Sequence, residues 1–183
     1  MRAPSPLPTV SRYTTTAIAL HWLTAVLIVC AVAIGLYMVE LPMSVQRLKL
    51  FNWHKWFGIG ALIVVAVRMV WRVTHQPPVS QPDESGWQHA LAATVHLLMY
   101  ALMLAVPLVG WAYSSASGFP ITWLGVLPLP DWVPKDRELA EALKPWHWIL
   151  SYSLIALVSL HIAAALKHHF LDRDSILQRM RPW

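Results

Sequence analysis

Four long apolar stretches alternate with polar, proline-containing segments along the chain. The stretches cover residues 16–39, 53–73, 91–113 and 145–168. A helix rises about 1.5 Å per residue, so each stretch is long enough to cross the roughly 30 Å of bilayer hydrocarbon. The pattern therefore predicts an all-α membrane protein, a four-helix transmembrane bundle that uses residues 1–183 as a single domain.

Two of the connecting segments are long enough to need an interpretation of their own. Residues 76–83 are polar and rich in proline, which cannot continue a helix, so we expect a loop. Residues 114–144 carry a glycine and several prolines, and we expect a short helix at 136–143 within a cap over one membrane face. The first apolar stretch is too long for a signal peptide and is expected to remain in the mature protein.

Composition supports the membrane class and excludes several others. Apolar residues make up 57% of the chain and charged residues only 13%, which is roughly half the charged fraction of a soluble domain. The net charge of +5 comes from scattered basic residues rather than a basic stripe, so we expect no nucleic-acid partner. The single cysteine, Cys30, excludes an intramolecular disulfide and a covalent haem attachment motif.

Five histidines fall within or at the ends of the apolar stretches, where ionisable side chains are costly and usually functional. His147 and His161 are 14 residues apart, so on one helix they share a face, within about 40°, at depths about 21 Å apart. Counted from the helix ends, His21 is level with His161, and His54 is level with His147. Two histidine pairs at two depths are what two bis-histidine haems stacked across the bilayer require. A zinc site would need its ligands around one point.

Three glycines fit the same arrangement. Gly35 follows His21 by 14 residues, Gly110 follows His96 by the same number, and Gly58 lies one turn beyond His54. We interpret these glycines as clearance for a porphyrin between helices. The alternative is ordinary close packing of membrane helices through small residues.

Short motifs spread over nearly the whole chain carry a family resemblance. They are ALHWL at 19–23, HKWFG at 54–58, RMVWR at 68–72, HLLMY at 96–100, PLVGW at 107–111 and LHIAAALKHHF at 160–170. With these motifs the chain resembles the bacterial cytochrome b-561 family, whose four-helix fold is shared with cytochrome subunits of some hydrogenases and formate dehydrogenases. The resemblance implies two b haems in a bacterial inner membrane, one held by His21 and His161 and the other by His54 and His147.

His96 is left without a place in these pairs, although it is level with His21 and His161. It is a candidate to hydrogen-bond a quinone and relay its proton, to bind a haem propionate, or simply to satisfy a neighbouring polar group. His168 lies on the same stripe of the last helix as His161, seven residues nearer the cytoplasmic end, and joins the same candidate site. Basic side chains that are candidates for haem propionates are Arg68, Arg72 and Lys167. The alternative for these three is anchoring at the membrane surface by snorkelling.

Orientation follows from lysine and arginine. An even number of spans puts both termini on one side, with eight basic residues: Arg2, Arg12, Arg68, Arg72, Lys167, Arg173, Arg179 and Arg181. The other side has six: Arg47, Lys49, Lys55, Lys135, Arg137 and Lys144. The excess predicts cytoplasmic termini.

These observations favour an electron-transfer oxidoreductase, with superoxide or another periplasmic donor and ubiquinone as the acceptor. The resemblance implies superoxide, since family members that stand alone resemble superoxide oxidases. The six basic residues on the periplasmic side would steer an anion there, although acids in the same loop weaken that effect. One alternative is an anchor subunit that links a separate dehydrogenase or hydrogenase to the quinone pool. Another is a transporter or structural bundle with histidines as proton carriers.

Overall fold

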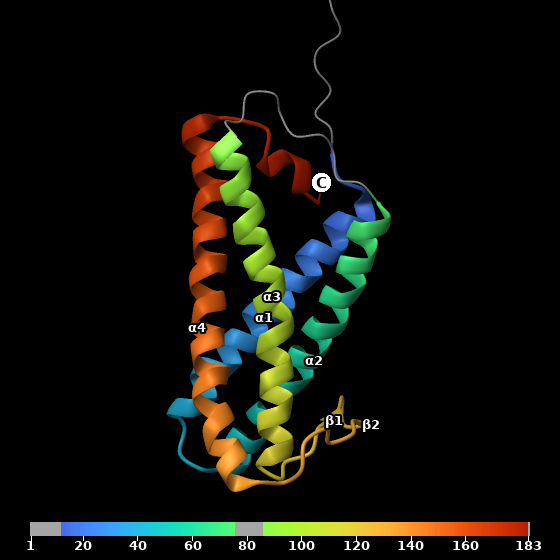
Figure 1. Ribbon diagram of the computed structural model, residues 1–183, viewed down its shortest axis with the longest axis vertical. Helices are drawn as coiled ribbons and strands as arrows, with labels where there is room; N and C mark the ends of the chain where they lie inside the picture. Colours follow the sequence, from blue (N-terminus) through green and yellow to red (C-terminus); the bar gives the residue numbers. More distant parts are fainter. Residues whose placement is uncertain (1–11, 76–85, 183) are drawn as a thin grey trace, which may run out of the picture.

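The computed structural model describes residues 12–75 and 86–182, and its architecture is a bundle of four long helices (Figure 1). The helices are α1 (Thr15–Glu40), α2 (Val45–Thr74), α3 (Gly86–Ala116) and α4 (Arg137–Lys167). All four are long and apolar enough to cross a membrane. The predicted all-α membrane bundle is therefore confirmed. The loop predicted at 76–83 lies outside the described residues.

The bundle is built from two helical hairpins, α1 with α2 and α3 with α4 (Figure 1). We call the end where α1 begins and α4 ends the terminal end. There α4 continues into a π-helical turn, η1 (His168–Asp172), and a 3₁₀ turn, η2 (Leu177–Met180). At the opposite end, which we call the hairpin end, the chain between α3 and α4 forms two short antiparallel strands, β1 (Thr122–Trp123) and β2 (Leu127–Pro128).

All four helices begin earlier than the hydropathy pattern predicts, and α2 and α4 do so by eight residues each. The separate short helix expected at 136–143 is wrong, because those residues are the first turns of α4. Asp136 caps this helix by accepting hydrogen bonds from the backbone N–H groups of Glu138 and Leu139, at 2.8 and 3.1 Å. Pro145 stands inside α4 without ending it. In the same way Ser44 caps α2, which begins at Val45, eight residues before its apolar stretch.

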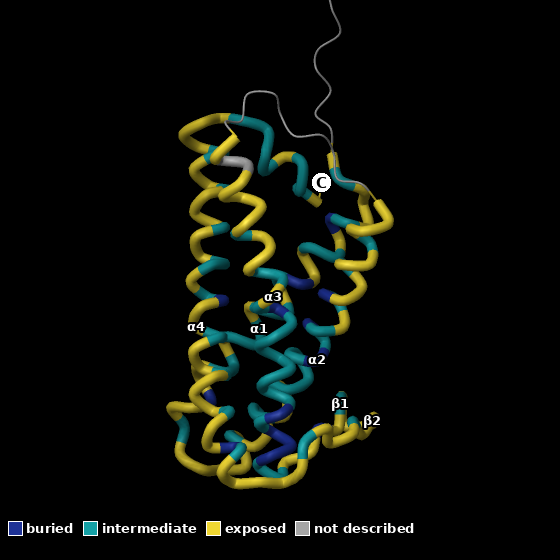
Figure 2. Tube along the Cα trace, in the orientation of Figure 1, coloured by how far each residue is buried: buried dark blue, intermediate teal, exposed yellow. Residues whose placement is uncertain are grey.

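Most residues of the bundle are exposed or half-buried, as expected for helices surrounded by lipid (Figure 2). Large apolar side chains such as Val29 and Val70 are exposed on the outer faces. A small cluster made of Val65, Met103 and Leu154 is buried at the centre, one residue from each of α2, α3 and α4. This central packing separates the two ends of the bundle, and histidines lie at both ends.

Candidate functional site

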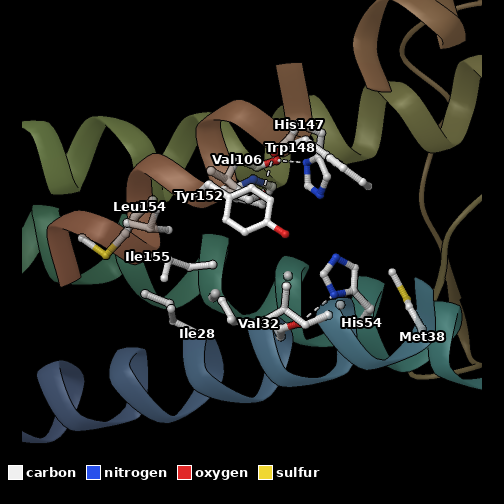
Figure 3. A pocket seen from close by; sticks show the side chains of 18 of the residues that line it. Ile28, Val32, Met38, His54, Val106, His147, Trp148, Tyr152, Leu154 and Ile155 are labelled. Atoms are coloured by element: carbon white, nitrogen blue, oxygen red, sulfur yellow. Dashed lines mark hydrogen bonds between the residues drawn. The ribbon is translucent and has the colours of Figure 1, made fainter. Parts of the chain in front are cut away.

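His54 of α2 and His147 of α4 face each other across a pocket near the hairpin end (Figure 3). Their ring centres are 6.2 Å apart and the ring planes are 89° apart. The pocket contains a cavity of about 150 Å³. Apart from the two histidines its lining is almost wholly apolar and comes from all four helices, with Val32, Met103, Val106 and Ile155 among the lining residues. We call it the histidine pocket.

A backbone hydrogen bond fixes each of these imidazoles. Nδ1 of His54 is 2.9 Å from the carbonyl oxygen of Ala31, and Nδ1 of His147 is 3.1 Å from that of Val106. A carbonyl oxygen only accepts, so each Nδ1 carries the proton and donates it. Each Nε2 therefore keeps its lone pair, and this is the tautomer in which histidine binds a metal.

Glycines make room for both rings. A Cβ atom at Gly35 would lie 3.0 Å from Cε1 of His54, and one at Gly110 would lie 2.8 Å from Cε1 of His147. Each glycine stands four residues after the carbonyl that accepts the bond, so its missing side chain lets the imidazole lie against the helix backbone. A Cβ at Gly58 would meet no described atom within 4 Å, and this glycine lines the open part of the pocket.

A second histidine cluster lies towards the terminal end. His161 of α4 is 6.3 Å from His21 of α1 and 5.4 Å from His96 of α3, measured between ring centres. The planes of His21 and His161 are 71° apart. The structure thus brings together the pairs expected from the sequence and adds His96 to one of them.

The ring separations provide a test of whether haem iron fits. An axial imidazole has its ring centre about 3.2 Å from the metal, so two rings on opposite sides are about 6.4 Å apart. The His54–His147 separation of 6.2 Å and the His21–His161 separation of 6.3 Å both match this value. The His96–His161 separation of 5.4 Å is too short. Both matching pairs therefore fit bis-imidazole ligation.

The two helical hairpins repeat the same spacing of histidine, accepting carbonyl and glycine. In α1, His21 precedes the accepting carbonyl by ten residues and the glycine by 14, and in α3 His96 has the same spacing. In α4, His161 follows His147 by 14 residues, and in α2 the residue 14 after His54 is Arg68. The 14-residue spacing in the sequence therefore reveals the repeat, and Arg68 occupies the position in α2 that His161 occupies in α4.

Arg68 and Arg72 line a smaller pocket at the terminal end, which we call the arginine pocket; its lining is more polar than that of the histidine pocket. Its cavity volume is about 30 Å³, and its lining also includes Trp71, His75, Tyr100 and Met180. The guanidinium carbon of Arg68 lies 5.4 Å from the ring centre of Tyr100. The hydroxyl of Tyr100 is buried and has no hydrogen-bond partner among the described residues.

Lys167 and His168 lie apart from this pocket and have acidic partners of their own. Lys167 Nζ is 2.6 Å from Asp172 Oδ2, and His168 Nδ1 is 2.6 Å from Asp174 Oδ2. Asp174 also accepts from the backbone N–H of Ile176. These contacts connect the end of α4 to the turn that follows it.

A four-helix membrane bundle with facing histidine pairs at two depths has the architecture of a membrane b-type cytochrome. The chain belongs to the prokaryotic cytochrome b561 family, whose profile matches residues 12–183. This membership confirms the resemblance, implies b-type haem, and makes the chain a membrane electron-transfer protein of bacterial type.

Curated relatives are similar over almost the full chain. Cytochrome b561 homolog 2 of Escherichia coli is 34% identical, covering 94% of this chain and 92% of the relative. Cytochrome b561 homolog 1 of the same organism is 28% identical, covering 94% and 98%. A protein of Yersinia pestis named "Probable superoxide oxidase CybB" is 28% identical, covering 93% and 96%.

Proposed function

We propose that this chain is a superoxide:ubiquinone oxidoreductase that carries electrons through two b haems, from the hairpin end to the terminal end. The observation that carries the proposal is that two histidine pairs, towards opposite ends, have the same ring separation of 6.2 to 6.3 Å. His54 and His147 would hold one haem, and His21 and His161 the other. A continuous path across the bilayer requires both.

Haem held by these histidine pairs would supply one-electron chemistry, and because two imidazoles would leave no open position on each iron, transfer would be outer-sphere. The residues of the chain hold the groups and exclude water. The Ala31 and Val106 carbonyls orient the imidazoles of His54 and His147, and the apolar lining of the histidine pocket keeps its interior dry. Because these hydrogen bonds fix the imidazole orientations, the histidines would move little during electron transfer.

Superoxide as the donor is supported by the charge at the hairpin end, which we propose to be periplasmic. Lys55 follows His54 directly, and Arg47, Lys49, Lys135, Arg137 and Lys144 lie at the same end. A positive entrance raises the rate at which an anion arrives. One of these charges is neutralised locally, since Arg137 pairs with Glu141 at 2.8 Å. The name of the Yersinia pestis relative supports the same donor.

We propose the arginine pocket, with His96 beside it, as the region that holds quinone and the nearby haem propionates. Tyr100 and His96 are four residues apart on α3 and so share a face. The Tyr100 hydroxyl has no partner among the described residues and is available to donate to a quinone carbonyl. Arg68 and Arg72 offer positive charge for propionates. Two superoxide anions would leave as dioxygen, and their two electrons with two protons would convert quinone to quinol.

Stopped-flow spectroscopy of the purified protein tests this function. Haem reduction should follow mixing with superoxide, and re-oxidation should follow addition of ubiquinone. Protein reduced with dithionite and then mixed with ubiquinone tests the second half-reaction alone. Haem that superoxide leaves oxidised, but that a co-purifying dehydrogenase subunit reduces, would contradict the donor and favour the anchor-subunit alternative.

A further inference from the structure

The short hairpin of β1 and β2 is fastened to α2 by two tryptophans. Trp56 Nε1 donates to the carbonyl oxygen of Thr122 at 2.7 Å, and Trp123 Nε1 donates to the carbonyl oxygen of Trp56 at 3.1 Å. A Cβ at Gly125 in the turn would lie 3.8 Å from Cζ2 of Trp56. The hairpin therefore packs against the side of a membrane-spanning helix, as Figure 1 shows beside the lower part of α2.

The segment that forms this hairpin has an unusual composition for an exposed connection. Residues 118–130 contain no charged side chain, and Thr122 is the one hydroxyl-bearing residue among them. Nevertheless several of its apolar side chains are exposed, up to 83% for Val126, although Ile121 is buried. The other exposed apolar residues of the segment are Phe119, Leu124 and Leu127. In water such a patch would be unfavourable, so something apolar must cover it.

The turn itself is built to display these side chains. Leu124 has φ 54° and Gly125 has φ 74°. Glycine adopts this left-handed conformation easily, but a leucine there is strained. Leu124 is also exposed, so burial against the described residues does not offset the cost of its backbone conformation. A partner outside the described residues is needed.

The position of the hairpin along the bundle identifies that partner. Trp56 is 11 residues into α2, so the hairpin docks about 16 Å inward from the start of that helix. This is the depth of a membrane interface and not of the water beyond it. Exposed tryptophans gather at the same end of the bundle, as in an interfacial belt: Trp53, Trp132, Trp146 and Trp148. The lipid-facing surface of α2 thus continues onto the hairpin.

We propose that the tip of this hairpin, Leu124 to Leu127, inserts into the lipid interface beside α2. It acts as a membrane anchor for the whole connection between α3 and α4. The anchor holds the cap against Lys55 and Trp56, the residues that follow His54. Lys55 contributes through a hydrogen bond from its ammonium group to the carbonyl oxygen of Phe119 at 3.1 Å.

Spin-label accessibility in lipid nanodiscs tests the proposal. Cys30→Ala removes the single native thiol, and Val126→Cys then places a label at the tip. Val29→Cys, on the exposed face of α1, is the matched label in lipid, and Glu138→Cys, in the first turn of α4, is the matched label in water. Relaxation is measured with dissolved oxygen, which concentrates in lipid, and with a water-soluble nickel complex. Unchanged absorbance of bound haem shows that each variant is folded.

The expected result is an oxygen-to-nickel accessibility ratio at position 126 nearer to that at position 29 than to that at position 138. A ratio nearer to that at position 138 would overturn the proposal, because it puts the tip in water and leaves the patch for a protein partner. A further variant, Val126→Asp with the label moved to Leu124→Cys, should shift the ratio towards water. A ratio that the new charge leaves unmoved would also contradict insertion.

Discussion

Gly110 and His147 are packed so closely that a single methyl group on the glycine would lie 2.8 Å from the imidazole carbon Cε1. The carbonyl oxygen of Val106, which accepts the hydrogen bond from His147, lies one helical turn earlier on α3. Gly35 and Ala31 form the same arrangement with His54. Each proposed ligand at the hairpin end thus donates a hydrogen bond to a backbone carbonyl of the neighbouring helix and packs against a glycine of the same helix.

Gly110→Ala should therefore displace His147. Inserting one methyl group into a tightly packed site typically costs about 1–3 kcal/mol, and the imidazole is the atom group that must move. We expect the variant to keep its fold and to lose one of two haems, as measured by the pyridine haemochrome assay per mole of chain. Gly35→Ala should do the same through His54.

Gly60→Ala is the matched control for both glycine variants. A Cβ at Gly60 would meet Leu27 at 3.7 Å, which is ordinary contact. This variant should retain both haems. If Gly60→Ala loses haem to the same extent as Gly110→Ala, the close approach of glycine to imidazole is not what matters.

Gly58→Ala separates haem binding from stability. No described atom lies within 4 Å of the added methyl, which points into the histidine pocket. The haem-free protein should melt at the wild-type temperature, while haem binding should weaken, because the methyl occupies space beside His54. Equal haem occupancy in the variant and the wild type would place the porphyrin elsewhere in the pocket.

The sequence predicted the bundle well because a membrane imposes a length and an apolar composition on every span. It predicted the ends of α2 and α4 poorly. Hydropathy detects the part of a helix that lies in hydrocarbon, whereas α2 begins at Val45 and α4 at Arg137, in polar turns capped by Ser44 and Asp136. Capping residues were present in the sequence, but residues 136–143 were predicted as a separate short helix and not as the first turns of α4.

For the candidate site, helical periodicity was enough to pair the histidines by depth, since residues 14 apart share a face. It was not enough for Arg68, Tyr100 and His168. The surroundings of these residues depend on contacts between distant segments, such as His168 with Asp174 or Arg68 with Tyr100. Periodicity on one helix carries no information about which neighbour fills the space beside it.

The ring planes of His54 and His147 lead to a spectroscopic prediction. They are 89° apart, and perpendicular axial imidazoles leave two iron d orbitals nearly equal in energy. The oxidised protein should therefore give a strongly anisotropic low-spin signal in electron paramagnetic resonance. His147→Ala should lose the part of this signal that comes from the His54–His147 pair, while the His21–His161 pair, with planes 71° apart, should keep its own. A wild-type signal of only moderate anisotropy would contradict the perpendicular arrangement.

His168→Ala tests whether this histidine belongs to the quinone region or to the turn after α4. Its imidazole is 2.6 Å from Asp174 and 3.3 Å from Asp172. A partly exposed pair of this kind contributes roughly 0–1 kcal/mol. We expect a small loss of stability, with haem spectra and quinone kinetics unchanged. Slower re-oxidation of reduced haem by quinone would return His168 to the candidate site.

His96→Ala tests the residue whose spacing matches that of His21 but whose distance to His161 is too short for a shared iron. If His96 serves quinone, the variant should retain both haem spectra, because no iron loses a ligand. A lost hydrogen bond to a neutral carbonyl should cost about 0.5–1.5 kcal/mol of binding, whereas a lost proton relay should slow quinone reduction by about 100-fold or more.

His96→Gln separates the two effects, since an amide donates a hydrogen bond but does not transfer a proton. We expect His96→Gln to restore the Kd for quinone and to leave re-oxidation slow in stopped-flow traces. Loss of one haem in His96→Ala would instead make His96 an axial ligand, and wild-type kinetics in both variants would leave it a packing residue.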